Sequence, residues 1–203
     1  MSKIYFYKLT VDNGGAPCVR RSLLSLAICK PMIRKTAEKG DLIFGFAANS
    51  LHPDNRLIYV ACVTEKLDGE YYKRYPKRPD SIYQRRGSRF IWKPGAKYHG
   101  PEDLRHDLGM YPDYLRANVL LSRSFRYFGG TEIDCYKRKF SRIKRAVESL
   151  GQGARVHHNE ELRRELSELA EFIFNTTPPD SVGQPTTGPS RDVCLRGRSC
   201  GVV

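Results

Sequence analysis

The sequence lacks the short motifs that identify the commonest enzyme classes. It contains no Walker phosphate loop, no GxGxxG dinucleotide fingerprint, no GxSxG nucleophile turn and no HExxH zinc motif. Its six cysteines include no CxxC pair and share no metal-ligand spacing, and the adjacent His157 and His158 do not face one another. We therefore expect no metal and no cofactor, and any chemistry has to come from individual side chains.

Long apolar runs are also missing. The longest, residues 23–29, is far shorter than the roughly 18 residues of a membrane-spanning helix and is interrupted by Ser25. The first five residues lack the apolar stretch of a secretion signal and are typical of the start of a strand. Scattered cysteines suit a reducing compartment. These absences predict a cytoplasmic protein with no membrane partner.

Acidic residues are scarce in one segment. Residues 71–98 hold nine Lys or Arg and a single acid, Asp80, so this segment supplies +8 of the net charge of +13. A concentrated positive charge favours a polyanionic partner, because each phosphate contact releases counterions. We predict DNA or a nucleotide as the partner, with RNA as a second candidate. The alternative is a basic surface that serves only solubility.

Three segments predict buried strands. Residues 3–11, 42–48 and 57–64 are rich in aromatic and β-branched side chains. The last of them, LIYVACVT, has the continuous apolar character of a strand that is buried on both faces. We expect the second and third segments to pair as a hairpin at the centre of the sheet.

A short helix is predicted between the first two of these strands. Pro31 suits the first turn of a helix, and Gly40 suits its C-terminal cap, so the helix should cover about residues 31–39. The apolar side chains that should face inward are those of Met32, Ile33 and Ala37.

Two longer helices are predicted near the C-terminus. An apolar stripe at helical spacing indicates one over about residues 134–150, and Asn159 is a good N-cap for the next. The first carries many cations and the second five glutamates, so the pair could set a basic face against an acidic one. The alternative is that the cations contact nucleic acid.

These patterns predict an α+β fold, in which residues 3–128 form a partly open barrel or a twisted mixed or antiparallel sheet and a C-terminal helical pair follows. We expect an α+β domain over residues 1–130 and a helical extension over residues 131–175 packed on it. Residues 176–203 are rich in Pro, Gly, Ser and Thr and predict a disordered tail.

Cations alternate with aromatic rings along residues 71–98. Bases stack on such rings while Lys and Arg follow the phosphates, so the composition suits a single-stranded or flipped base. The alternative is that the rings pack in the core while the cations solvate loops. The residues that we assign to nucleic-acid binding are Tyr83, Arg85, Arg86, Arg89, Trp92, Lys93 and Tyr98.

Polar side chains around His99 could carry acid/base chemistry. His99 and His106 are seven residues apart, with Asp103 and Asp107 close by. On a helix these residues would share a face, which is compatible with a metal or an acid/base site. Pro101 and the turn residues around it argue against such a helix.

Four residues are the catalytic candidates: Cys29, Lys30, Arg34 and His99. Arg34 could clamp a phosphate through two hydrogen bonds, and His99 could transfer protons near neutral pH. Cys29 is explained as well by burial as a small apolar side chain. Lys30 and Arg34 are explained as well by a solvated helix face.

The order of several segments carries a family resemblance. A Cys-Lys-Pro-x-Ile-Arg sequence at residues 29–34 is followed by Gly40-Asp41, then by the Leu-Ile-Tyr of residues 57–59 and later by Tyr98-His99. Over about residues 3–130 the chain resembles the second type of nucleotide modification associated domain. That family accompanies DNA-base hypermodification in bacteria and their viruses, which implies a bacterial or phage protein that works beside other base-modification proteins.

A weaker similarity concerns the PUA-like β-barrels, including their EVE-type members. The helix, Gly-Asp, strand, strand order of residues 31–65 carries it. It implies a partly open barrel that holds a modified or flipped base in an aromatic pocket.

Two functions therefore stay open. The first is a binding module that holds one modified or flipped base among aromatic rings while basic loops contact the phosphates. The second is an enzyme of nucleotide or DNA-base modification that acts on a phosphorylated substrate. Convergence of Arg34, Tyr83 and His99 in one pocket would favour the enzyme, whereas a pocket with only aromatic rings and neutral acceptors would favour the binding module.

Overall fold

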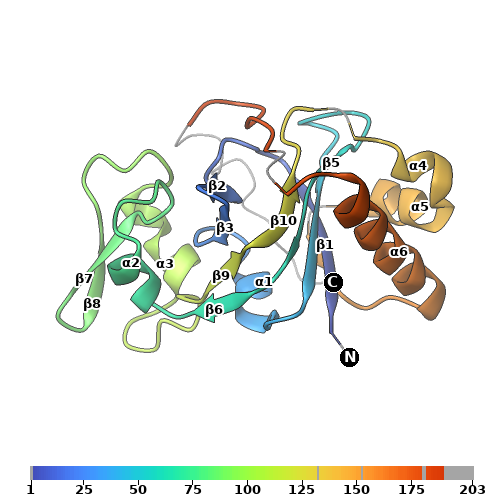
Figure 1. Cartoon of the computed structure of the whole chain (residues 1–203). Coiled ribbons are helices and arrows are strands. Elements are labelled where there is room, and N and C mark those ends of the chain that lie inside the picture. Colours follow the sequence, from blue (N-terminus) through green and yellow to red (C-terminus); the bar gives the residue numbers. More distant parts are fainter. Residues whose placement is uncertain (1, 132, 152, 180–181, 190–203) are drawn as a thin grey trace.

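A central mixed sheet organises the fold. The computed structural model describes residues 2–131, 133–151, 153–179 and 182–189 (Figure 1). In this sheet the strand order is β10 (Ser124–Tyr127), β5 (Leu57–Cys62), β4 (Leu42–Ala47), β1 (Ile4–Leu9) and β11 (Ala154–Arg155). Strands β1 and β4 are parallel, and the other neighbours are antiparallel. The predicted central hairpin is confirmed, because β4 is the middle strand and β5 is its antiparallel neighbour.

Two smaller sheets extend the structure to one side. The first has the order β2 (Cys18–Arg20), β3 (Leu23–Leu26), β9 (Val119–Ser122) and β6 (Glu65–Leu67), all antiparallel. The second is the hairpin of β7 (Tyr83–Arg86) and β8 (Arg89–Trp92). The fold is α+β, as predicted. Over the residues that the structure describes, no sheet closes into a barrel, and the PUA-like barrel stays a prediction.

Short helices connect these sheets. They are α1 (Pro31–Thr36), α2 (Glu70–Arg74), the 3₁₀ turn η1 (Pro101–Asp103) and α3 (Leu104–Leu108). The inward orientation of Ile33 and Ala37 on and after α1 is confirmed, since both are buried. For Met32 the prediction is wrong, because its side chain is 46% exposed. The helix ends at Thr36, where the Ala37 N–H closes its last bond onto the carbonyl of Ile33.

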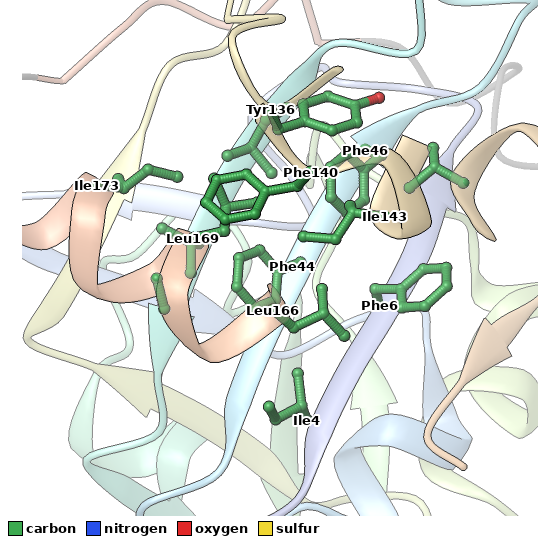
Figure 2. Packing of buried hydrophobic residues seen from close by; sticks show 14 of the residues in the cluster. Ile4, Phe6, Phe44, Phe46, Tyr136, Phe140, Ile143, Leu166, Leu169 and Ile173 are labelled. Carbon is green, nitrogen blue, oxygen red and sulfur yellow. The ribbon is translucent and has the colours of Figure 1, made fainter. Parts of the chain in front are cut away.

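Helices near the C-terminus cover one face of the central sheet. The predicted helical pair is corrected to three helices, because the helix expected over about residues 134–150 is divided at Phe140, whose backbone is not helical. The three are α4 (Tyr136–Lys139), α5 (Ser141–Ser149) and α6 (Glu160–Thr176). Figure 2 shows their buried side chains packed against Ile4, Phe6, Phe44 and Phe46 of β1 and β4. Alternate residues of β1, including Tyr5 and Tyr7, point to a second core on the other face, as the two-residue repeat of a strand requires.

The C-terminal helices are joined by the predicted charge pairing. The Asn159 side chain caps α6 by accepting a hydrogen bond from the backbone N–H of Leu162. The Glu165 carboxylate accepts hydrogen bonds from the backbone of Arg142 and from its guanidinium, and Glu161 forms an ion pair with Arg142. These contacts favour the interpretation in which a basic face meets an acidic one.

Residues 182–187, which we expected to belong to a disordered tail, are hydrogen-bonded to the body. The backbone of Gly183 donates to the carbonyl of Tyr127, and Gly130 donates to the carbonyl of Gln184. The Asp12 carboxylate accepts both the N–H and the hydroxyl of Thr186. Residues 180–181 and 190–203 of the expected tail lie outside the described residues. No helix of the described chain is long and apolar enough to cross a membrane.

Candidate active site

Cys29 lies in the connection between β3 and α1. Its backbone is left-handed, with φ of 55°, and so is that of Lys30, with φ of 44°. Two successive non-glycine residues in this region are strained, and such strain persists only where the surrounding structure holds it. Here the Cys29 N–H donates to Asp107 Oδ1 at 2.9 Å, and the Cys29 carbonyl accepts from Arg34 Nη1 at 3.0 Å. The backbone of Cys29 is thus fixed on both sides.

His99 faces the Cys29 thiol. Its Nε2 lies 3.1 Å from Cys29 Sγ, and its Nδ1 lies 2.6 Å from Asp107 Oδ2. The imidazole is 1% exposed, whereas Cys29 is half-buried. A half-buried sulfur, a buried imidazole and a buried carboxylate therefore form one continuous chain of polar contacts.

The Asp107 carboxylate comes from α3 and is completely buried. Besides His99 and the Cys29 N–H, it accepts the Tyr83 hydroxyl at 2.7 Å. Three donors aimed at one carboxylate hold its orientation, and the carboxylate in turn holds the His99 ring with Nδ1 inward.

The electrostatics of the pair match this geometry. Burial alone would lower the pKa of His99, but the neighbouring Cys29 sulfur and the hydrogen bond to Asp107 outweigh it and raise this pKa to about 11. Burial would raise the pKa of Asp107, yet the bond from His99, the charges of His99 and Arg34 and the Tyr83 bond lower it. Both shifts favour an imidazolium between a carboxylate and the sulfur at neutral pH.

Arg34 has a different place from the one its sequence position suggested. Its side chain is completely buried, and its guanidinium donates to the carbonyls of Cys29, Asp107, Arg116 and Asn118. It therefore joins the two segments that carry Cys29 and Asp107. The guanidinium is directed at these carbonyls inside the protein rather than at a phosphate.

Lys30 follows Cys29 directly in the chain, and its side chain lies over the Tyr7 ring. Its Nζ is 4.6 Å from the centre of the Tyr7 ring, a cation–π distance. The Tyr7 and Tyr59 hydroxyls are 2.9 Å apart. Burial, Tyr59 and the charge of Cys29 all raise the pKa of Tyr7, so this ring belongs to the surroundings of the sulfur.

The residues assigned to nucleic-acid binding separate into two groups. Tyr83 and Tyr98 are buried, and their hydroxyls donate inside the protein, to Asp107 and to the Asn13 carbonyl. Lys93 is half-buried and donates to the Ser81 carbonyl, and Trp92 is half-buried at the end of β8. The group that is exposed on the β7–β8 hairpin consists of Arg85, Arg86 and Arg89.

The sequence indicated Cys29 and His99, and it named Asp107 as one of two acids near His99, but it did not show that Asp107 joins the two. His106, which the sequence placed beside His99, is exposed on α3, while His99 lies before η1 and turns into the core. Asp107 is 78 residues from Cys29, so only the folded chain shows their contact. Within the described ranges, no group of three or more His, Cys, Asp or Glu side chains could hold a metal.

The structure is that of an α+β domain with a Cys-His-Asp array. The family model named "Nucleotide modification associated domain 2" matches residues 1–188, and the chain belongs to this family. The match extends beyond residue 130 through all three C-terminal helices. No curated protein and no solved structure matches the chain. Membership associates the protein with nucleotide or DNA modification systems.

Proposed function

We propose that the protein is a cysteine-dependent acyl-transfer enzyme of a nucleotide or DNA-base modification system. The observation that carries this proposal is the contact chain from Cys29 Sγ through the His99 ring to Asp107, at 3.1 Å and 2.6 Å. A nucleophile in contact with a base that a third group orients is the arrangement used for covalent acyl transfer. Tyr83 donates to Asp107, and Arg34 donates to the carbonyls of Cys29 and Asp107, so both residues brace this contact chain from inside the protein.

The reaction follows from the roles of the three groups. The Cys29 sulfur attacks the carbonyl carbon of an acyl or amide group on the substrate, and the new C–S bond gives a thioester. His99 passes its Nε2 proton to the departing amine or alcohol, so the C–N or C–O bond breaks without an anionic leaving group. Water or a second amine then attacks the thioester, and His99 takes up its proton. Cys29 leaves as the thiolate, and the array is restored.

The remaining groups position this array. Asp107 keeps His99 Nδ1 protonated and its ring turned to the sulfur, and Tyr83 holds Asp107. Lys30, the neighbour of Cys29 in the chain, adds a positive charge over the Tyr7 ring, and this charge favours an anionic substrate. The reaction needs a free thiol, which supports the cytoplasm as the compartment.

The alternative is a module that binds a modified or flipped base without reacting. The basic and aromatic composition of residues 71–98 supports it. Against it, the Tyr83 and Tyr98 rings are buried in an apolar cluster that also contains Phe90 and Leu108, which removes two of the surfaces on which a base would stack. A passive reader would not require the contact between Cys29 Sγ and His99 Nε2.

Site-resolved alkylation tests the enzyme proposal. The rate of iodoacetamide addition to Cys29 is compared by peptide mass spectrometry with the rate at Cys62, which is also half-buried but whose pKa is raised by burial. We expect Cys29 to react at least about tenfold faster near neutral pH, and the His99→Asn variant to lose this advantage. Equal rates at the two cysteines would contradict the proposal.

Turnover gives the second readout. Nucleosides and oligonucleotides whose bases carry acyl or amide substituents are offered to the wild type and to Cys29→Ser. The wild type should show a mass increase on Cys29 that hydroxylamine removes, as expected of a thioester, and Cys29→Ser should show none. If melting temperatures agree, a mass increase that survives in Cys29→Ser would contradict Cys29 as the nucleophile.

A further inference from the structure

The β7–β8 hairpin and the loop after α3 meet where Ser88 and Arg89 contact Tyr111. Both segments carry exposed side chains, which include Arg85, Arg86 and Arg89 on the hairpin and Met110, Tyr111 and Leu115 on the loop, where Asp113 is also exposed. The three large apolar loop residues are 57%, 48% and 61% exposed, which is unusual for side chains of their size. We call these three residues and the three arginines the hairpin patch.

Contacts with three neighbouring side chains hold the Tyr111 ring in place. The Arg89 guanidinium lies over the ring, 5.0 Å from its centre, and the Tyr111 hydroxyl is 3.4 Å from Ser88 Oγ. Tyr114 packs edge-on against the same ring at 5.8 Å. An aromatic ring held in one orientation at the surface, beside cations, is the element on which an unpaired base stacks.

The charge of the hairpin patch selects an anionic partner. Arg85 is 3.6 Å from Glu70, an exposed and weak pair, whereas Arg86 and Arg89 have no ion pair within the described part of the chain. Residues 81–98 contain no acid at all. Arginines beside an exposed ring match a polymer that offers phosphates and base faces together, which a free nucleotide offers only once.

Packing connects the hairpin patch to the array at Cys29. Tyr114 packs edge-on against Phe90, Phe90 against Tyr72, and Tyr72 against Tyr83, with ring centres 5.1–5.7 Å apart. Tyr83 donates to Asp107. The loop that carries Tyr111 begins directly after α3, which supplies Asp107. The hairpin patch is thus built on the same rigid cluster as the site.

From these contacts we propose that the hairpin patch binds single-stranded nucleic acid, with a base stacked on Tyr111 and the phosphates on Arg85, Arg86 and Arg89. This inference rests on the proposed function in taking the polymer as the substrate of Cys29. The residue that stacks is then Tyr111 rather than the buried Tyr83 or Tyr98. The substrate is a nucleotide within a strand rather than a free one.

Fluorescence anisotropy with labelled oligo-dT and oligo-U of about 15 nucleotides tests the proposal, with a duplex of the same length for comparison. Tyr111→Ala should weaken single-strand binding about tenfold with an unchanged salt dependence, since stacking involves no counterion release. Tyr111→Phe keeps the ring and should bind like the wild type. Either polymer bound in this way supports the proposal, and the tighter one identifies the substrate.

A matched pair of triple variants tests the arginines. Replacing Arg85, Arg86 and Arg89 by Ala should reduce the slope of log affinity against log salt by about 2, at ~0.7 for each phosphate that the protein no longer neutralises. The control replaces Arg138, Lys144 and Arg145, three exposed cations of α4 and α5 at the other end of the molecule (Figure 1). It removes the same charge and should leave the slope unchanged.

Three results would overturn the inference: wild-type binding by Tyr111→Ala, equal losses of affinity in the two triple variants, or equal affinity for duplex and single strand. Alkylation of Cys29 in the same variants separates this inference from the proposed enzyme. An unreactive Cys29 beside Tyr111-dependent binding would contradict the thiol chemistry alone. A reactive Cys29 with binding that ignores Tyr111 would contradict the hairpin patch alone.

Discussion

Two buried aspartates, Asp107 on α3 and Asp80 in the turn before β7, have similar hydrogen-bond partners but different surroundings. Asp107 and Asp80 are both completely buried, and each accepts a tyrosine hydroxyl at 2.7 Å. Asp80 also accepts the Ser25 hydroxyl at 2.5 Å and lies 3.5 Å from Arg78 Nε. All its partners are buried or tied to carbonyls of the β2–β3 hairpin. The Asp80 network therefore fastens residues 71–80 to that hairpin.

The Asp107 network differs in its last member. Its chain runs through a titratable ring to a half-buried sulfur instead of ending on hydroxyls and a guanidinium. The pKa values of the two aspartates also differ. Burial raises the pKa of Asp80. Burial would also raise the pKa of Asp107, but the hydrogen bond and the charge of His99, together with the charge of Arg34, lower it. A buried carboxylate becomes part of a reactive site when the group it orients can exchange a proton with a nucleophile.

The largest effect is expected from Asp107→Asn. The amide cannot hold His99 as an imidazolium and disfavours the required tautomer, so the rate of thioester formation should fall about 10³- to 10⁴-fold. A single-turnover experiment measures this rate. Asp80→Asn is the matched control and should keep thioester formation within about tenfold of the wild type. Equal losses of rate in both variants would remove the distinction between the networks.

The second effect concerns stability. Asp80→Ala removes two hydrogen bonds and leaves Arg78 without its carboxylate, so the free energy of unfolding should fall by about 3 kcal/mol. Urea unfolding measures this loss. Alkylation of Cys29 in the folded variant should proceed at the wild-type rate, and a slower rate would show that the two networks are coupled.

The third effect is a pH dependence of stability, which has opposite signs for His99 and His158. The pKa of His99 in the folded protein, about 11, exceeds its ordinary value of 6.5, so its stabilising contribution is complete below about pH 6.5 and is lost as the pH rises towards 11. Burial lowers the pKa of His158, so its contribution is present above about pH 6.5 and is lost as the pH falls.

Urea unfolding from about pH 5 to about pH 9 measures both contributions. The stability difference between wild type and His99→Asn should shrink with rising pH, by at most about 1.4 kcal/mol per pH unit. The difference for His158→Asn should grow instead, until it levels off above about pH 6.5. Parallel behaviour of the two variants would contradict the imidazolium at His99.

The smallest effects are expected from two tyrosine variants, one in each aspartate network. Tyr71→Phe and Tyr83→Phe each remove one buried hydroxyl that donates to an aspartate, at the same distance. Both variants should lose about 1 kcal/mol of stability. Only Tyr83→Phe should also slow thioester formation, by about tenfold, because only Asp107 orients a reacting group. A matching loss of rate in Tyr71→Phe would count against this assignment.

Local patterns predicted much of the fold. The central hairpin, the Asn159 cap and the apolar side of the last helix were readable, because turn chemistry and periodicity act over a few residues. Met32 was misplaced because the helix is only six residues long and ends before its stripe is established. The loop-rich segment of residues 70–112 gave no periodicity from which its pairing could be inferred.

The site was only half predictable, for a related reason. Cys29 and His99 are reactive residue types and could be named, whereas Asp107 was one of two acids named near His99. Arg34 was expected to meet a phosphate, yet it bonds to carbonyls of residues 107–118, which are remote in sequence. Contacts of this kind depend on how two loops meet, and no spacing along a chain encodes that.

The order of strands in the central sheet also determines how long an apolar face stays uncovered while the chain is being synthesised. Strand β1 leaves the ribosome first, but its neighbour β11 and the helices that cover Phe44 and Phe46 lie much later in the chain. At about 5–20 residues per second, the nascent chain displays that apolar face for several seconds before α6 is complete. A chain shortened near residue 130 would display it permanently, so expression of such a fragment should yield aggregates, whereas the whole family region covers its own face.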